Sequence, residues 1–394
     1  MAENARTGVA IVGLGGAVAT TAVAGVELMK LGAVGTDGLP LADTAGLVPY
    51  TSLVFAGWDV DGDDLAKAAH GHRVLDDRQI EAAGPALADI EPWPAVADPE
   101  YCRNARGTNL VAVPALRDRV AHIAGDLRRF REEQGLDALV VVNLASTERW
   151  PDLTLPALAS ADGFEKALDV DDAAITPGML YAYAAITEGC PYVNFTPSAA
   201  ADVPGLLELA EHRGVPVAGK DGKTGQTMMK TVLAPAFRSR ALTVDGWYST
   251  NILGNRDGEI LDDPDSLSSK VQTKGSVLDD ILGYEVGDHV VRIDYYRPRG
   301  DEKEAWDNID LSGFLGQRMQ IKVDFMARDS VLAAPLVLEL VRLVVEAQRR
   351  GEGGAQEQLG YFFKAPTTRD GRRPEHALHV QEQVLRDWIG AGAA

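Results

Sequence analysis

Gly219 to Lys274 reads GKDGKTGQTMMKTVLAPAFRSRALTVDGWYSTNILGNRDGEILDDPDSLSSKVQTK. Its opening loop, GKDGKTGQT, holds three glycines whose backbone N–H groups can converge, and it adds hydroxyl, amide and ammonium donors. The loop is not a nucleoside-triphosphate P-loop, because Val217 stands where that motif needs a glycine. It therefore predicts a phosphate site of another kind.

Two later features of this stretch each have two interpretations. The segment NILGNRDG, from Asn251 to Gly258, is either a second binding loop or a hairpin, since Asp-Gly favours a type I′ turn. Lys270 and Lys274 are four residues apart and would share one face of a helix, where like charges normally mark a solvated surface. Neither feature distinguishes a site from a surface by itself.

The order of several motifs along the chain favours a site. GKDGKTGQT, YSTNILGNRDG, the Lys-x-x-x-Lys pair, RGDEK (Arg299 to Lys303) and YFFKAP (Tyr361 to Pro366) resemble, in that order, the motifs of the myo-inositol-1-phosphate synthase family. The resemblance implies an α/β fold in which a Rossmann-type NAD-binding domain carries an inserted antiparallel-sheet α+β domain for catalysis and tetramerisation. It also implies NAD as cofactor and a homotetramer.

Composition limits the partners. The chain has 394 residues, enough for two compact units, and a formal net charge of -20, which argues against a nucleic-acid or anionic-membrane surface. A phosphorylated substrate must then be met by local lysines. Cys102 and Cys190 have no second Cys or His at metal-ligand spacing, so we expect neither a disulfide nor a metal site, and a reducing compartment.

No membrane segment is expected either. The N-terminus, MAENARTG, lacks the pattern of a signal peptide, and Glu339 and Arg342 interrupt the apolar run 331–345. These features predict a cytoplasmic protein.

The N-terminus indicates a nucleotide-binding half. A buried strand, Gly8 to Val12, precedes a glycine turn and a helix over 17–31, which together present free N–H groups to a dinucleotide pyrophosphate. The turn consists of Gly13, Leu14, Gly15 and Gly16. Asp59 follows the second strand and is placed either to bind a ribose hydroxyl, which selects NAD over NADP, or to cap the next loop. Its separation from Gly13 exceeds the usual ~20 residues, so an insertion within 32–49 is expected.

The remaining elements follow from hydrophobic patterning. The Val-rich run Gly135 to Ala145 predicts a buried parallel strand, and alternation over His289 to Tyr296 and Met319 to Phe325 predicts strands covered on one face. Residues 60–134 read as a helical, charged connector, with turn breaks at Pro85, Pro92, Pro94 and Pro99. Asp329 and Ser330 read as the N-cap of a helix from Val331. We expect one domain at 1–227 with 331–394 and a second at 228–330.

The resemblance also implies a reaction. The family converts D-glucose 6-phosphate to 1D-myo-inositol 3-phosphate without net redox change, by C5 oxidation with NAD, enolisation, aldol closure of C6 onto C1 and re-reduction. Each step places negative charge on an oxygen, which fixed ammonium groups can stabilise. None of the chain's seven histidines falls within these motifs, which disfavours a histidine base.

Residue by residue, the resemblance implies three sets of site residues. The catalytic set is Lys270, Lys303, Lys364, Asp221, Asp257 and Asn251, with Lys364 as proton acceptor and Asp221 orienting a lysine. The phosphate set is Thr224, Gly225, Gln226, Leu253, Asn255 and Lys274. The cofactor set is Gly13, Leu14, Gly15, Gly16, Asp59, Ala145, Thr147, Asp301, Asp329 and Ser330.

Three other functions remain open at this level. A related cyclitol-phosphate synthase would use the same lysines on another sugar phosphate, such as fructose 6-phosphate, and close a five-membered ring. A simple NAD-dependent dehydrogenase would accumulate NADH. A non-catalytic sugar-phosphate or nucleotide sensor would give no product.

Overall fold

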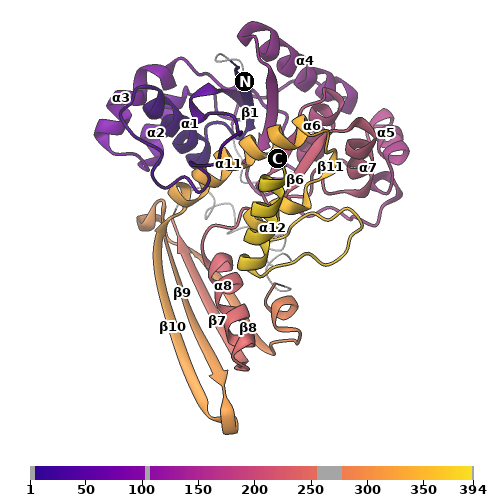
Figure 1. The fold of residues 1–394 in the computed structure, drawn as a ribbon. Coiled ribbons are helices and arrows are strands. Elements are labelled where there is room, and N and C mark those ends of the chain that lie inside the picture. Colours follow the sequence, from indigo (N-terminus) through magenta and orange to yellow (C-terminus); the bar gives the residue numbers. More distant parts are fainter. Residues whose placement is uncertain (1–4, 103–106, 255–276, 393–394) are drawn as a thin grey trace.

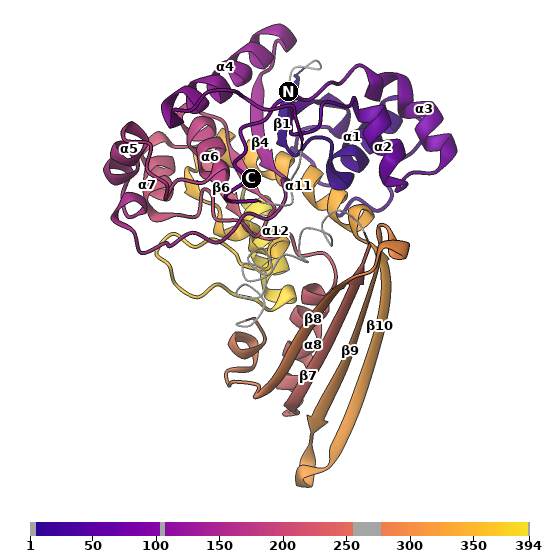
Figure 2. The ribbon, with the colours of Figure 1, turned by 180° about the vertical axis from the view of Figure 1, so that it is seen from behind.

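Two sheets organise the chain. The structure is a computed structural model and describes residues 5–102, 107–254 and 277–392 (Figure 1). Within these ranges, a seven-stranded sheet lies in the α/β part and a four-stranded sheet projects away from it, as both views show (Figures 1 and 2).

The large sheet has the strand order β11-β6-β5-β4-β1-β2-β3, and its neighbours all pair in parallel. Its strands are β1 (Thr7–Val12), β2 (Leu53–Asp59), β3 (Trp93–Pro94), β4 (Ala138–Asn143), β5 (Tyr192–Asn194), β6 (Pro216–Gly219) and β11 (Gly354–Ala355). The order 3-2-1-4-5-6 is that of the doubly wound dinucleotide-binding fold, with β11 added beside β6. This order confirms the predicted Rossmann-type domain.

Helices cover both faces of this sheet. They are α1 (Ala17–Lys30), α2 (Leu65–His72), α3 (Asp77–Ala88), α4 (Leu116–Gln134), α5 (Ala161–Asp169), α6 (Pro177–Thr187), α7 (Pro204–Arg213), α11 (Asp329–Arg349) and α12 (Leu378–Ala391). Short 3-10 turns are η1 (Tyr50–Ser52), η2 (Pro156–Leu158), η3 (Arg297–Arg299), η4 (Phe314–Gly316) and η5 (Glu357–Phe362). Successive β1 residues enter different cores: Val9 and Ile11 pack with α1 and α11, while Ala10 and Val12 pack with α4 and α6. Such two-sided burial explains the continuous apolar runs of the parallel strands.

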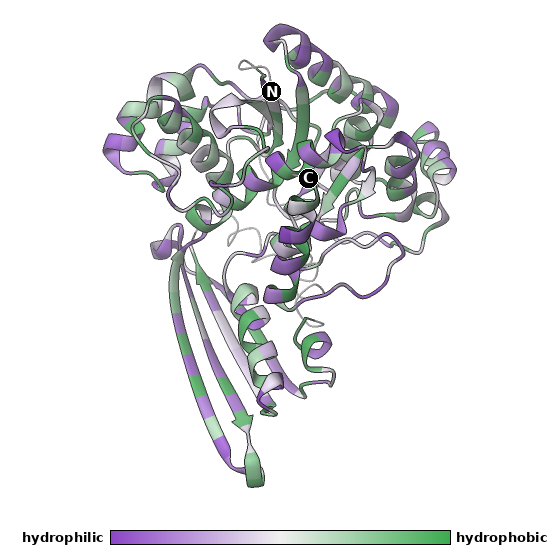
Figure 3. Ribbon diagram, in the orientation of Figure 1, coloured by the Kyte–Doolittle hydropathy of each residue, from purple (hydrophilic) through white to green (hydrophobic). Residues whose placement is uncertain are grey.

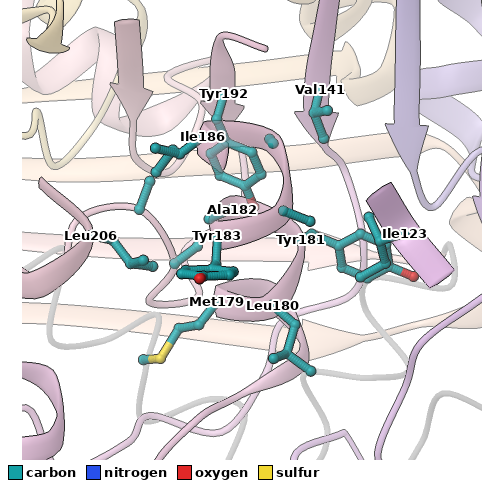
Figure 4. Packing of buried hydrophobic residues seen from close by; sticks show 14 of the residues in the cluster. Ile123, Val141, Met179, Leu180, Tyr181, Ala182, Tyr183, Ile186, Tyr192 and Leu206 are labelled. Carbon is teal, nitrogen blue, oxygen red and sulfur yellow. The ribbon is translucent and has the colours of Figure 1, made fainter. Parts of the chain in front are cut away.

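Helix α6 shows how tightly one of these faces is packed. Ten of its eleven residues, Pro177 to Ile186, are buried. Figure 4 shows its side chains between the neighbouring strands and helices. The labelled residues are Ile123, Val141, Met179, Leu180, Tyr181, Ala182, Tyr183, Ile186, Tyr192 and Leu206. Helix α6 therefore packs closely against β4 and β5.

The second sheet has the order β10-β9-β7-β8. Its elements are α8 (Gln226–Ser239), β7 (Thr243–Leu253), β8 (Asp288–Tyr295), β9 (Glu302–Ser312) and β10 (Arg318–Arg328). The expected antiparallel pairing holds for β10, β9 and β7, but β8 pairs with β7 in parallel, so the sheet is mixed. Helix α8 covers one face through Phe237 against Trp247 and Ile309. Alternating green and purple along β9 and β10 in Figure 3 matches the predicted one-sided burial.

Three expectations about local structure have clear outcomes. Residues 32–49 form no helix or strand, as expected for an insertion; Glu339 of α11 anchors them by accepting the Leu41 N–H at 2.9 Å. Pro85 lies inside α3, so the predicted break there is wrong; α3 starts at a capping box formed by Asp76 and Gln79 and continues through the proline. Pro94 lies in β3, so the segment 60–134 also supplies an edge strand.

The register of the large sheet determines where a site can form. Val12 pairs with Trp58 and with Asn143, Asn143 pairs with Asn194, and Asn194 pairs with Gly219. The carboxyl ends of five strands therefore meet at one edge, where ligands bind in this fold. Among the described residues, no helix is long and apolar enough to cross a membrane.

Candidate active site

A cavity lies where these strand ends face the second sheet. Most of the predicted cofactor and catalytic residues that the structure describes line it, together with Thr224 of the phosphate set. These are Gly13, Gly16, Asp59, Ala145, Thr147, Asp221, Thr224, Lys303, Asp329, Ser330 and Lys364. The cavity therefore joins the glycine turn of the Rossmann domain to lysines from β9 and from the C-terminal segment.

The glycine turn is shaped by close backbone contacts. Gly13 has a φ of +85°, and a Cβ there would lie 2.9 Å from the Ala145 Cα. Gly16 is the N-cap of α1 without a side-chain cap, so the first-turn N–H groups have no side-chain acceptor there. Leu14 is fully buried in the core and can offer only its backbone. A helix N-terminus of this kind attracts a pyrophosphate.

The structure confirms the capping interpretation of Asp59, and its role at a ribose stays a prediction. One oxygen accepts the Gly15 N–H at 2.8 Å, and the other accepts the Asp61 N–H at 3.0 Å. The carboxylate thus caps the following loop and also lines the cavity. Each carboxylate oxygen can accept more than one hydrogen bond, so ribose hydroxyls can still donate to it.

The loop after β4 brings a residue that the sequence analysis missed. Glu148 follows Thr147, lines the cavity, and its Oε1 accepts the Gly178 N–H at 2.9 Å. Burial raises the pKa of Glu148 to about 7. The available signal was only its position just after a buried strand, where ligand contacts gather in this fold.

Two distant segments pair to place the predicted proton acceptor. The Lys364 N–H donates to the Asp221 carbonyl at 2.7 Å, and the Lys364 Nζ donates to the Asp221 Oδ1 at 2.7 Å. An antiparallel bridge between Gly222 and Phe363 continues the pairing. A Cβ on Gly222 would collide with the Phe195 ring at 2.1 Å, which explains the glycine there.

A second pair of charged side chains, Lys303 and Asp329, also lines the cavity. Asp329 accepts the Thr224 hydroxyl at 3.1 Å and lies 3.5 Å from the Lys303 Nζ. The N-cap interpretation of Asp329 is wrong: Arg328 holds the cap position without a side-chain cap bond, and Asp329 is the first residue of α11. Its carboxylate is directed to the site because β10 delivers it beside Thr224.

Asp301 lies behind the cavity rather than in its lining. It accepts the Ser330 hydroxyl at 2.7 Å and the Ser330 N–H at 3.3 Å, and its own carbonyl accepts the Asp329 N–H at 3.2 Å. Asp301 therefore holds the start of α11 against β9, and Ser330 reaches the cavity from there.

Three of the predicted phosphate residues, Thr224, Gly225 and Gln226, lie at the N-terminus of α8. Gly225 is its N-cap and Gln226 its first residue. Asn251 donates to the Gln226 Oε1 at 2.7 Å, whereas the buried Gln226 Nε2 donates no hydrogen bond within the described chain. Leu253 is buried at the end of β7. A free amide donor beside uncapped helix N–H groups suits an anion.

Lys220 and Lys223, the two lysines of the GKDGKTGQT loop, do not line the cavity. The expectation that this loop supplies ammonium donors to a phosphate is therefore wrong. Lys220 pairs with Asp202 at 2.5 Å and lies over the Trp150 ring. Lys223 donates to Gln381 of α12 at 2.5 Å. Burial lowers the pKa of Lys223 to about 7. Both ammonium groups are used to dock other segments.

Four predicted residues, Asn255, Asp257, Lys270 and Lys274, lie outside the described residues. Within the described ranges, no group of three or more His, Cys, Asp or Glu side chains could hold a metal ion.

Known proteins agree with this arrangement. A family model described as myo-inositol-1-phosphate synthase matches residues 35–389. Inositol-3-phosphate synthase 1 of Bacteroides thetaiotaomicron is 40% identical over 98% of this chain and 96% of its own length. Inositol-3-phosphate synthase isozyme 1 of Arabidopsis thaliana is 32% identical over 89% of this chain and 73% of its own length.

Solved structures give the same result. Inositol-3-phosphate synthase from Caenorhabditis elegans superposes with a TM-score of 0.92 at 27% identity, over 98% of this chain and 86% of that one. A myo-inositol-1-phosphate synthase-related protein from Thermotoga maritima has a TM-score of 0.80 at 25% identity, over 98% of both chains. This chain belongs to the myo-inositol-1-phosphate synthase family.

Proposed function

We propose that the chain converts D-glucose 6-phosphate to 1D-myo-inositol 3-phosphate, using NAD without net redox change. The observation that supports this reaction best is the pairing of Lys364 with Asp221 in the cavity that also contains the glycine turn. A cofactor turn and a positioned ammonium group in one enclosure suit oxidation followed by enolisation and ring closure.

The glycine half of the cavity fits NAD. The close approach of Gly13 to Ala145 and the uncapped N-terminus of α1 accommodate a pyrophosphate, and Asp59 suits a ribose diol. Bound there, NAD supplies reversible hydride transfer at C5 of the sugar. Thr147 would contact the cofactor from the loop after β4, and Ser330 from α11.

Lys364 and Lys303 would act on the sugar oxygens. Asp221 holds the Lys364 Nζ by a hydrogen bond, which orients the amine to accept or return a proton at the C5 oxygen. Lys303, beside Asp329, would stabilise the negative oxygen that forms during enolisation and closure. Both ammonium groups come from outside the Rossmann strands, so the second sheet and the C-terminal segment complete the site.

The N-terminus of α8 would bind the substrate phosphate. Thr224 offers a hydroxyl and Gln226 a free amide donor, and the uncapped N–H groups at Gly225 add a positive dipole end. Lys270, Lys274, Asn255 and Asp257 remain implied by the family resemblance, with Lys274 and Asn255 at the phosphate.

We also propose that the chain works as a homotetramer in the cytoplasm. The face of the second sheet opposite α8 is open in a single chain, and it exposes Val290, Trp306 and Met326. Exposed charged residues, among them Arg292, Lys322 and Asp324, alternate with these apolar side chains, and a second copy would cover this mixed face. The division into 1–227 with 331–394 and 228–330 is part of this proposal, because the projecting sheet lies within the second segment.

The test is an incubation of the purified protein with NAD and, separately, glucose 6-phosphate or fructose 6-phosphate. We expect glucose 6-phosphate to give an isomeric cyclitol phosphate, identified by mass and NMR spectrum, without net NADH. A five-membered product from fructose 6-phosphate would move the proposal to the related synthase. Accumulating NADH would indicate a dehydrogenase, and no product from any sugar phosphate would indicate a sensor.

A further inference from the structure

His72, the last residue of α2, lies in the lining of the cavity although no family motif contains it. Its Nε2 is 2.7 Å from the carbonyl oxygen of Gly15 in the glycine turn. A carbonyl oxygen can only accept a hydrogen bond, so Nε2 must carry the proton in this contact. The ring therefore acts as a donor to the turn.

With this contact, both the N–H and the carbonyl of Gly15 are hydrogen-bonded. The Gly15 N–H donates to the Asp59 Oδ2 at 2.8 Å, while its carbonyl accepts from His72. A backbone carbonyl carries partial negative charge, so a peptide that rotated its oxygen toward a pyrophosphate would repel it. Holding this carbonyl at α2 keeps the N–H groups that follow, at the start of α1, available as donors.

Charge in the cavity also singles out His72. Among the lining residues that the structure describes, the groups able to carry positive charge are His72, Lys303 and Lys364. The two lysines lie beside Asp329 and Asp221, on the proposed substrate side. Carboxylates also line the cavity, at Asp59, Asp98 and Glu148. Among these described lining residues, His72 is thus the basic side chain that contacts the glycine turn.

The end of α2 is held on a second side as well. Arg73 follows the helix directly and has a left-handed backbone conformation. Its carbonyl accepts a hydrogen bond from the Arg328 Nη2 at 2.9 Å. Arg328 directly precedes Asp329, the carboxylate beside Lys303. The position of His72 is therefore set by contacts to the cofactor turn and to the start of α11.

We propose that His72 is a positioning residue for the dinucleotide: it fixes the Gly15 carbonyl so that the glycine turn keeps its donors directed at the pyrophosphate. The inference deepens the proposed function and rests on its assignment of NAD to this cavity. It concerns cofactor affinity and leaves the chemistry of the sugar to Lys364 and its neighbours.

The experiment is calorimetric titration of NAD into the full-length protein without sugar phosphate. His72→Ala should raise the Kd for NAD about tenfold, as expected for one lost hydrogen bond to the turn. His72→Gln should recover most of the affinity, because its amide Nε2–H can donate in place of the imidazole. His70→Ala is the matched control, since His70 is exposed on the same helix two residues away. The Kd of this control variant for NAD should equal that of the wild type.

The outcomes separate this proposal from the one on which it rests. Wild-type protein that fails to bind NAD overturns the cofactor assignment itself. If the wild type binds NAD and His72→Ala binds it with the same Kd, only the role of His72 is overturned. The same holds if His72→Gln melts like the wild type but binds NAD as weakly as His72→Ala. At saturating NAD, the KM for sugar phosphate should match the wild type in the Gln variant.

Discussion

The Gly219–Gly225 loop has one side toward the cavity and one toward the protein interior, and the buried charged residues on these two sides have different kinds of partner. On the cavity side, Asp221 pairs with Lys364. On the interior side, Lys223 is equally buried, but its partner is the neutral amide of Gln381, and burial lowers the pKa of Lys223 to about 7. Burial alone therefore does not distinguish Lys364, the lysine that we propose as catalytic, from Lys223; the charge of its partner and its access to the cavity do.

Lys230, one turn into α8, extends the comparison. Its Nζ lies 2.7 Å from the His289 Nε2 and over the Trp247 ring, and Lys230 does not line the cavity. Burial lowers the pKa of Lys230 to about 8. Like Lys223, it joins a helix to a neighbouring element rather than to a substrate.

The largest expected effect tests the two sides against each other. Lys364→Met should lower turnover by about 10²–10⁴-fold while the Kd for NAD stays within about twofold, because a positioned proton acceptor is lost but the glycine turn is untouched. Lys223→Met should retain most of its turnover. Steady-state kinetics and NAD titration measure both. Equal losses in the two variants would remove the distinction.

Lys223, on the interior side of the loop, should also make the free energy of unfolding depend on pH. The pKa of Lys223 is lower in the folded chain than its usual value of 10.5, so between pH 7 and 10.5 unfolding takes up a proton and stability rises with pH. Between pH 6 and pH 9 the wild type should gain about 3 kcal/mol of unfolding free energy relative to Lys223→Met. Urea unfolding at both pH values checks this; parallel profiles would contradict it.

Glu148, in the cavity wall, should titrate with the opposite sign. Burial raises the pKa of Glu148 from 4.5 to about 7, so its contribution is present below pH 4.5 and is lost as pH rises through 7. From pH 4.5 to pH 8 the wild type should lose about 3 kcal/mol relative to Glu148→Gln, which keeps an oxygen for the Gly178 N–H. If the stability difference between the wild type and this variant instead stays constant over this range, the folded carboxyl is ionised throughout and its pKa is not raised.

The smallest effect concerns the hydroxyl at the edge of the loop. Thr224→Val should raise the KM for the sugar phosphate about five- to tenfold with an unchanged Kd for NAD, since the hydroxyl that here donates to the Asp329 Oδ1 could no longer turn to donate to the phosphate. Thr224→Ser keeps the hydroxyl and should behave as the wild type. An unchanged KM in the Val variant would argue against a phosphate at the α8 N-terminus.

Much of the fold could be predicted because its signals are local. The Val-rich runs at β1 and β4 predict parallel strands, and alternation in β8 and β10 predicts one-sided burial. Local patterns could not decide that β8 pairs with β7 in parallel, because strand direction depends on the route of the intervening chain. They also misread Pro85, since the capping box before it and the packing of α3 override a proline's tendency to break a helix.

The candidate site divides in the same way. The family resemblance placed Gly13, Asp59 and Lys364 among the site residues, and all three line the cavity. It gave no role to His72 or Glu148, which also line the cavity. The sequence alone also did not show that Lys223 is buried against Gln381, away from the cavity. These depend on which side chains meet after folding.

By itself, the sequence determined the element types, the glycine turns and the family, because backbone conformation and hydrophobic period are properties of neighbouring residues. Only the tertiary structure decided which ammonium groups reach the cavity and which are held by neutral partners. The reason is physical: Lys364 lies 143 positions from Asp221, and their contact at 2.7 Å exists only when the C-terminal segment pairs with the loop after β6.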